Sequence, residues 1–197
     1  MRWLALVLLL LLLMTGCKPP TSALEPLKDL VAEDVTGATY AQNFELFDHH
    51  GQRRTLADFR GKVVVVFFGY THCPDVCPTT LYDFSRALKL LGADAKKVQV
   101  LFVTLDPARD TPEILSLYVP AFDAGFLGLY ADAAYTAQLA KQYQIYYRYQ
   151  AIDSAGNYAI DHSAFTYVYD TEGRLRLRMP FAENPVDIAN DLYKLLR

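Results

Sequence analysis

The sequence predicts an α/β fold with a central mixed sheet flanked by helices. Two runs rich in β-branched and aromatic residues, VVVVFFGY (Val63–Tyr70) and VQVLFVTL (Val98–Leu105), indicate strands that are buried on both faces. Between these runs, apolar residues recur at helical spacing, which indicates a helix over residues 78–92. Because strands that alternate with helices form βαβ units, we expect parallel pairing in the middle of the sheet.

The other elements extend this pattern toward both ends of the chain. The alternation of apolar and polar residues in NFELFD (Asn43–Asp48) predicts a half-buried strand, and TLADF (Thr55–Phe59) is expected to return beside it as an N-terminal β-hairpin extension. A proline after Thr111 and an acid after that proline mark the start of a helix that runs to about Phe122. Later strands are predicted at residues 128–132, 145–152, 164–170 and 174–179, and later helices at 133–143 and 184–196.

The loop GYTHCPDVCPTT (Gly69–Thr80) follows the first buried strand and holds two of the three cysteines. Pro78 fits the first helical position, which would place Cys77 at the helix N-cap and Cys73 one turn upstream. A buried strand that leads into a loop with two cysteines and then a helix is the thioredoxin-like plan. Because a helix N-terminus favours negative charge, at least one thiol should ionise more readily than a free thiol. The pair could hold a metal ion or form a redox disulfide, and its spacing does not decide between them.

The net charge of −3 and the lack of any basic block exclude nucleic-acid binding as an expected function. At the N-terminus, Arg2 precedes an apolar run from Trp3 to Met14, which is shorter than the roughly 20 residues that span a bilayer. A short apolar run after a positive charge is typical of a secretory signal. The small residues before Cys17 make the segment similar to a bacterial lipoprotein signal, in which this cysteine carries the lipid.

This pattern predicts that the chain is divided into three parts. We expect a lipoprotein signal peptide at residues 1–16, a membrane tether at 17–37 and a thioredoxin-like domain at 38–197. The domain is then expected on the periplasmic side of a bacterial membrane, held by the lipid on Cys17, with the inner membrane favoured. A plain secretory signal or an uncleaved short anchor would also fit the apolar run.

His162, in the stretch IDHSAF, is the third candidate for a metal site. It is predicted to lie on a loop before the strand at 164–170, and only the fold could bring it to the cysteines. Thioredoxins carry a cis-proline in this loop, whereas this loop has no proline, and the cysteine spacer has three residues instead of two. Both differences argue against an ordinary disulfide oxidoreductase. Two thiolates and an imidazole suit copper, whereas a structural zinc site takes four protein ligands.

With these residues in view, the sequence resembles the Sco/SenC family. The motifs GKVVVVFFGYTHCPDVCPTTL, VTLDPARDTPE and DHSAFTYVYD, with the EGR turn that follows, carry the resemblance over roughly residues 39–197. The resemblance implies a membrane-anchored, periplasmic thioredoxin-like domain that binds one copper ion, as Cu(I) or Cu(II), through Cys73, Cys77 and His162. It also implies a periplasmic copper donor and, as acceptor, the CuA centre in subunit II of cytochrome c oxidase. The family anchor is often a transmembrane helix, and here a lipid is expected instead.

Several alternatives stay open at this stage. Some Sco/SenC members resemble thiol–disulfide oxidoreductases that keep the CuA cysteines reduced, so an enzyme of this kind or a thiol peroxidase is the competing hypothesis. A structural periplasmic domain with an incidental disulfide is the third. The stretch 146–149, rich in tyrosine, could line a docking surface, although packing of a strand on its neighbours is the commoner role for alternating aromatic residues.

The sequence also predicts roles for other polar residues near these motifs. Asp161 precedes the candidate histidine and could orient its ring, or it could be a solvated loop acid. Asp106 and Asp110 in the LDPARDTP loop are expected to cap and turn the chain. His49 and His50 are expected to be solvated in the hairpin turn, with a second copper site there as the less favoured alternative.

Overall fold

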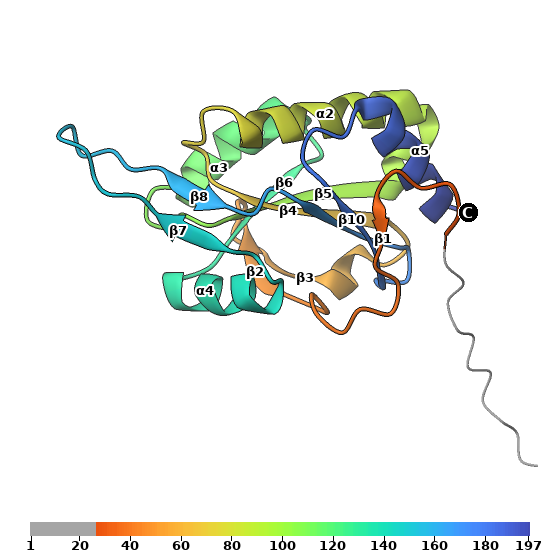
Figure 1. Cartoon of the computed structure of the whole chain (residues 1–197), viewed down its shortest axis with the longest axis horizontal. Coiled ribbons are helices and arrows are strands. Elements are labelled where there is room, and N and C mark those ends of the chain that lie inside the picture. Colours follow the sequence, from red (N-terminus) through yellow and green to blue (C-terminus); the bar gives the residue numbers. More distant parts are fainter. Residues whose placement is uncertain (1–26) are drawn as a thin grey trace, which may run out of the picture.

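An eight-stranded mixed sheet forms the centre of the computed structural model, which describes residues 27–197 (Figure 1). The predicted signal peptide, Cys17 and the first part of the tether lie outside these residues. The strands of this sheet, in their spatial order, are β1 Glu33–Asp34, β10 Leu175–Met179, β9 Thr166–Tyr169, β4 Val63–Gly69, β5 Val98–Thr104, β6 Leu127–Tyr130, β2 Glu45–Asp48 and β3 Arg53–Thr55. A separate pair comprises β7 Tyr147–Tyr149 and β8 Ile160–His162.

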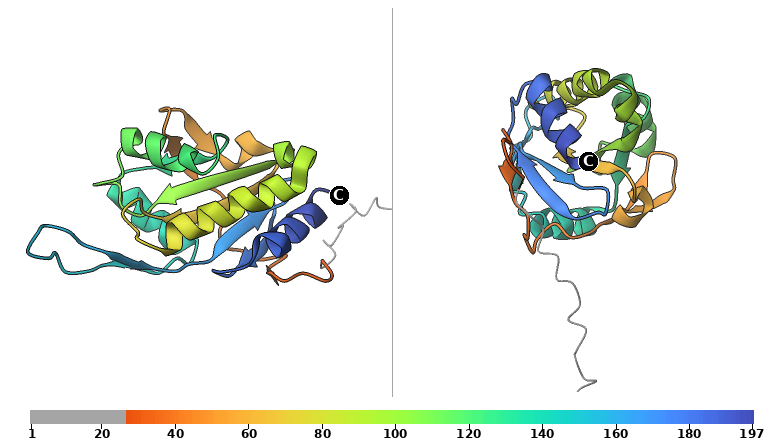
Figure 2. Two further views of the ribbon diagram at one scale, coloured as in Figure 1. Left: turned by 90° about the horizontal axis from the view of Figure 1, so that it is seen from above. Right: turned by 90° about the vertical axis from the view of Figure 1, so that its right-hand side faces the viewer.

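Helices cover both faces of the sheet (Figures 1 and 2). The helical segments are α2 Val76–Leu91, α3 Pro112–Tyr118, α4 Ala133–Gln142 and α5 Pro185–Leu195, with the 3-10 turns η2 Leu56–Phe59, η3 Gly92–Lys97 and η4 Val119–Ala121. Helices α2, α3 and α5 share one apolar core with the sheet, and α4 and η2 share a second core on the opposite face. The structure therefore confirms the predicted α/β class and the flanked mixed sheet.

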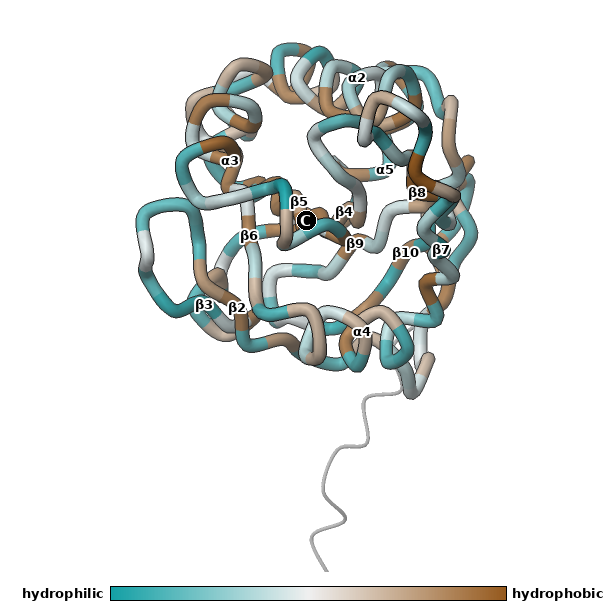
Figure 3. The backbone as a smooth tube through the Cα atoms, turned by 90° about the vertical axis from the view of Figure 1, so that its left-hand side faces the viewer, coloured by the Kyte–Doolittle hydropathy of each residue, from teal (hydrophilic) through white to brown (hydrophobic). Residues whose placement is uncertain are grey.

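The two runs predicted as buried strands lie side by side at the centre. Strands β4 and β5 pair in parallel over their whole length, from Val63 opposite Val98 to Gly69 opposite Thr104. Every residue of both strands is buried. Figure 3, coloured by residue hydropathy, shows the two strands in the interior of the domain. Because α2 connects the two strands, both strands end at the same edge of the sheet, where the cysteine loop begins.

The hairpin extension forms, but its second strand lies earlier than predicted. Strand β3 pairs antiparallel with β2 and ends at Thr55, and the remaining residues of TLADF, Leu56–Phe59, form the 3-10 helix η2. The reason is a capping box, in which the backbone N–H of Thr55 donates to the Asp58 carboxylate at 2.6 Å. The resulting turn buries Leu56 and Phe59 against the sheet.

Helix α2 also begins earlier than predicted. Its N-cap is Asp75, so Cys77 lies within the first turn instead of at the cap, and Pro78 occupies the third helical position. A proline is tolerated there because the first-turn N–H groups have no partner within the helix.

The end of the predicted tether packs on the domain. Strand β1 pairs antiparallel with β10 at the edge of the sheet. The backbone N–H groups of Val31 and Ala32 donate to the Asp191 carboxylate of α5, at 3.0 and 2.8 Å. Within residues 27–197, every helix is too short or too polar to cross a membrane.

A buried carboxylate lies in the turn between β10 and α5. Glu183 is 7% exposed, and neither carboxylate oxygen has a hydrogen-bond partner among residues 27–197. Burial, together with the charges of Asp191 and Asp187, raises the pKa of Glu183 from its usual 4.5 to about 7. Because the folded protein holds this proton more tightly than the unfolded chain, the free energy of unfolding should fall as the pH rises through this range.

Replacing Glu183 by glutamine should abolish this loss of stability, because an amide does not ionise. We expect the Glu183→Gln variant to be more stable than the parent by about 1–3 kcal/mol near pH 8 and of nearly equal stability near pH 4. Urea unfolding at the two pH values measures the difference. Glu172→Gln, at a largely exposed carboxylate, is the matched control and should show no such difference. Equal stability of Glu183→Gln and the parent near pH 8 would contradict the prediction.

Candidate metal centre

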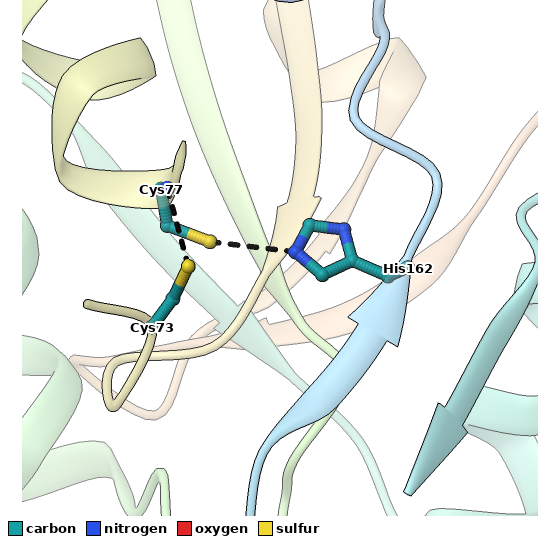
Figure 4. A group of neighbouring side chains, drawn as sticks. All are labelled: Cys73, Cys77 and His162. Atoms are coloured by element: carbon teal, nitrogen blue, oxygen red, sulfur yellow. Dashed lines mark hydrogen bonds between the residues drawn. The ribbon is translucent and has the colours of Figure 1, made fainter. Parts of the chain in front are cut away.

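Three sulfur and nitrogen groups converge at the edge where β4 ends (Figure 4). Cys73 lies in the loop after β4, Cys77 in the first turn of α2 and His162 at the end of β8. One ligand atom from each residue lies within 4.8 Å of the other two. Among the described residues, this is the one group of three or more His, Cys, Asp or Glu side chains that could hold a metal ion. The fold therefore brings together the three residues that the sequence singled out.

The two cysteines are free thiols that differ in exposure. The side chain of Cys77 is buried, whereas Cys73 is only partly buried. The backbone N–H of Cys77 donates to Cys73 Sγ at 3.4 Å, which is the stabilisation that a helix N-terminus offers to an anion. Cys73 is thus the more exposed of the two cysteines, and Cys77 belongs to the core.

Protonation of the pair follows from this geometry. A hydrogen bond from the Cys77 thiol, with further ones from the backbone, lowers the pKa of Cys73 well below its usual value. The same thiol–thiolate hydrogen bond, with burial, raises the pKa of Cys77. Of the two thiols, Cys73 is therefore the one whose ionisation the fold favours, because its sulfur also accepts the backbone N–H of Cys77.

The sequence predicts a loop at His162, but in the structure this residue is the last of strand β8. Strand β8 pairs antiparallel with β7, and His162 lies opposite Tyr147 in this register. Its Nδ1 atom lies 2.8 Å from the carbonyl oxygen of Ser163, and a carbonyl can only accept, so Nδ1 carries the proton. The other nitrogen, Nε2, is then free to bind a metal, and it lies 3.6 Å from Cys77 Sγ.

Aromatic rings flank the imidazole. The Tyr70 ring meets it edge-on, with centroids 5.9 Å apart, and the Phe67 ring lies at 6.3 Å. Sequence reasoning did not assign either residue to the site. Their position could have been inferred, because Phe67 belongs to the strand that leads into the cysteine loop and Tyr70 directly follows that strand.

Asp161 does not orient the histidine. Its carboxylate accepts hydrogen bonds from Arg148, at 3.2 Å, and from Gln150, both on the β7 side of the hairpin. Side chains alternate along a strand, so Asp161 and His162 point to opposite faces of β8. The group that fixes the ring is the carbonyl of Ser163.

The two acids of the LDPARDTP loop do more than cap and turn the chain, because their side chains also bind other residues. Asp110 is buried and accepts hydrogen bonds from the Thr71 backbone, at 3.0 Å, and from the Thr104 hydroxyl, at 2.6 Å. It therefore joins the start of the cysteine loop to the end of β5. Asp106 is also buried and pairs with Arg109 at 2.5 Å.

The two histidines of the hairpin turn behave differently from each other. His50 is exposed, as expected. His49 is buried instead of solvated, and its Nδ1 accepts the backbone N–H of Gly128 at 3.0 Å. This contact satisfies a buried backbone donor where β2 meets β6, so His49 has a role in packing.

The comparisons with known proteins agree with this geometry. A family model described as SCO1/SenC matches residues 32–197. The chain belongs to the SCO1/SenC family. Among curated relatives, the mitochondrial SCO2 homologue of Bos taurus is 40% identical over 133 residues, which cover 66% of this chain and 50% of that protein. The chain thus spans about half the length of the curated relatives that it matches first.

Solved structures of SCO1/SenC proteins superimpose on the described fold. ScoI of Bradyrhizobium japonicum, solved with copper bound, is 38% identical with a TM-score of 0.72, and the match covers 78% of this chain and 98% of that one. Yeast Sco1, also solved with copper bound, is 29% identical with a TM-score of 0.70, over 77% and 85% of the two chains. The thioredoxin-like fold predicted from the cysteine loop is therefore confirmed.

Proposed function

We propose that this SCO1/SenC protein is a copper carrier that holds one copper ion, as Cu(I) or Cu(II), through Cys73, Cys77 and His162. The observation that carries the proposal is the convergence of two sulfurs and one imidazole nitrogen within 4.8 Å. Thiolate and imidazole together suit copper. Two of the similar structures hold copper, which supports the same choice of metal here.

The exposure of the site suggests how the ion is passed on. Cys73 is partly exposed, whereas Cys77 is buried, so a thiolate of a partner would approach copper from the Cys73 side. The ion could then change protein by exchange of one ligand at a time. A Cys73–Cys77 disulfide would remove two of the three ligands, so loading with copper requires the reduced protein. Because binding displaces thiol protons, copper affinity should fall at low pH.

The proposed partners follow from the family resemblance. We propose that the protein receives copper from a periplasmic donor and assists assembly of the CuA centre in subunit II of cytochrome c oxidase. We also propose that a lipid on Cys17 anchors the chain on the periplasmic side of the inner membrane. The N-terminal sequence pattern supports this anchor and location.

Metal analysis of the reduced protein tests the proposal directly. The protein, purified without oxygen and reconstituted with copper, should hold about one copper ion per chain, because the site offers one set of three ligands. Elemental analysis after removal of loosely bound metal gives the ratio. The Cys73→Ser/Cys77→Ser variant is the control and should hold none. A copper content near zero in the reduced parent would refute the carrier function.

A second candidate function is supported by the difference between the two thiols. A partly exposed thiolate beside a buried thiol is the arrangement in which one cysteine attacks a disulfide and the other resolves the mixed disulfide. The lowered pKa of Cys73 fits the attacking role. The protein would then be a thiol–disulfide oxidoreductase acting on the CuA-site cysteines or on other periplasmic thiols.

A further inference from the structure

His162 is carried by an arm that is separate from the main sheet. Strands β7 and β8 pair only with each other, and the hairpin between them extends away from the domain in Figure 1. Strand hydrogen bonds therefore do not fix the arm relative to β4, from which the cysteine loop starts. The position of the imidazole beside the cysteines must depend on other contacts between the arm and the domain.

Three hydrogen bonds join the arm to the segment that follows β5. The Tyr149 hydroxyl donates to the carbonyl of Leu105 at 2.8 Å, and the Tyr158 hydroxyl donates to the Asp106 carboxylate at 2.8 Å. In the third, Arg109 Nη1 donates to the carbonyl of Tyr158 at 2.9 Å. Tyr158 thus receives contacts at both its side chain and its backbone, four residues before the imidazole.

Arg109 contributes two contacts to this attachment. Its guanidinium carbon lies 3.5 Å from the centroid of the Tyr158 ring, in addition to the hydrogen bond with the Tyr158 carbonyl. The opposite side of the guanidinium is held by Asp106, through Nε at 2.5 Å. The side chains of Arg109 and Asp106 are 20% and 0% exposed, so this ion pair is largely shielded from water.

The same segment also contacts the cysteine loop. The backbone N–H of Leu105 donates to the carbonyl of Gly69 at 2.7 Å, at the last residue of β4 before the loop. The guanidinium of Arg109 lies 5.9 Å from the ring of Tyr70, which in turn meets the imidazole edge-on. The residues after β5 are therefore a common support for both halves of the metal site.

We propose that Arg109 is a positioning residue, which fixes the β7–β8 arm so that His162 stays within reach of the ion held by the two cysteines. This inference rests on the proposed function, since it concerns the third ligand of the copper site. Arg109 itself does not bind the metal. Its closest contacts, with the ring and the carbonyl of Tyr158, lie on the arm, so its influence on copper should pass mainly through the imidazole.

A double-mutant cycle tests this dependence. Cu(II) affinity is measured by competition with a chelator for the parent, Arg109→Ala, His162→Ala and the double variant. Arg109→Ala should weaken binding by about 10–100-fold, the usual loss when a residue that orients a metal ligand is removed. In the His162→Ala background, the same substitution should change the affinity little, because the ligand that it positions is already absent. The electron paramagnetic resonance spectrum of Arg109→Ala should lose the nitrogen coupling of the imidazole.

Controls separate positioning from a general effect on folding. Arg174→Ala removes another arginine that is paired with a buried aspartate, Asp170, and it should leave copper binding unchanged. Arg109→Lys keeps the positive charge, but a lysine cannot bind Asp106 and the Tyr158 carbonyl at once through a planar guanidinium. This variant should therefore restore copper binding only in part. If Arg109→Ala fails to fold, Tyr158→Leu replaces it in the cycle, because it removes the stacked ring and leaves the Arg109–Asp106 pair.

The outcomes are distinct. A parent protein that binds no copper refutes the proposed function. A parent that binds copper, with Arg109→Ala or its replacement Tyr158→Leu equally tight, overturns the positioning role alone. A loss of affinity that persists undiminished in the His162→Ala background also overturns it, because the effect would then not pass through the imidazole.

Discussion

Replacing His162 by alanine is expected to lower the Cu(II) affinity of the reduced protein by at least about 100-fold, or roughly 2.7 kcal/mol. The Nε2 atom faces the Cys77 sulfur at 3.6 Å, and the Ser163 carbonyl holds the ring in the tautomer that can bind a metal. Alanine removes this ligand and leaves both sulfurs in place. Chelator competition, with the absorption of the copper–thiolate complex as the signal, measures the loss.

The same variant should keep its disulfide chemistry. The hydrogen bond from the Cys77 thiol is the main cause of the lowered pKa of Cys73, and the imidazole contributes less. His162→Ala should therefore form and reduce the Cys73–Cys77 disulfide at a rate close to that of the parent. His50→Ala, at the exposed histidine of the distant hairpin turn, is the matched control for copper binding.

This pair of measurements separates the two candidate functions. A copper carrier loses its metal when the third ligand is removed, whereas an oxidoreductase that relies on Cys73 and Cys77 loses little. If His162→Ala bound Cu(II) as tightly as the parent, the imidazole would not be a ligand. The carrier proposal in its three-ligand form would then be wrong.

The sequence predicted the centre of the fold because strong local patterns and tertiary structure agree there. The β-branched run of β4 is apolar at every position, and only a strand buried on both faces uses such a run. The cysteine loop follows this strand directly, so its place at the edge of the sheet followed as well. The convergence of His162 depended instead on the family resemblance, since no local pattern connects it to Cys77.

The sequence could not predict features that depend on distant contacts or on the register of a short strand. Strand β8 has three residues, too few to show a period, so the sequence pattern predicts a loop there. The imidazole could bind either Asp161 or the Ser163 carbonyl. Which of them it binds depends on the faces of β8 to which the Asp161 and His162 side chains point. The stacking of Arg109 on Tyr158 joins two segments that no sequence motif connects.

Gly69, the last residue of β4, gives the second large expected effect. A Cβ atom added to this residue would lie 2.8 Å from the Cys77 sulfur and 2.8 Å from the Phe102 ring. Both distances are shorter than a methyl group tolerates, so both neighbours, or the end of the strand itself, must shift. The Phe102 ring is fully buried, and the rings of Phe67 and Tyr118 lie against it. Cys77 is fully buried as well, so the added methyl group must displace its sulfur together with the surrounding core.

Gly69→Ala should consequently damage the metal site as well as the core. We expect a loss of about 1–3 kcal/mol in the free energy of unfolding from overpacking. We also expect a fall in copper affinity of about tenfold or more, because the Cys77 sulfur is displaced from the His162 imidazole that it faces. Urea unfolding of the metal-free protein and chelator competition measure the two effects separately.

Gly128→Ala is the control that isolates the effect on the metal. Gly128 also lies in a central strand, β6, and its added Cβ would meet Leu115 and Val119 of the helical layer at 3.1 Å. This contact involves neither cysteine, so the variant should lose stability without losing copper. If Gly69→Ala bound copper as tightly as Gly128→Ala, the close approach of Gly69 to the sulfur would matter for packing alone. If only Gly69→Ala loses copper affinity, the Cys77 sulfur needs the space beside Gly69, where a side chain would otherwise lie, in order to face the imidazole.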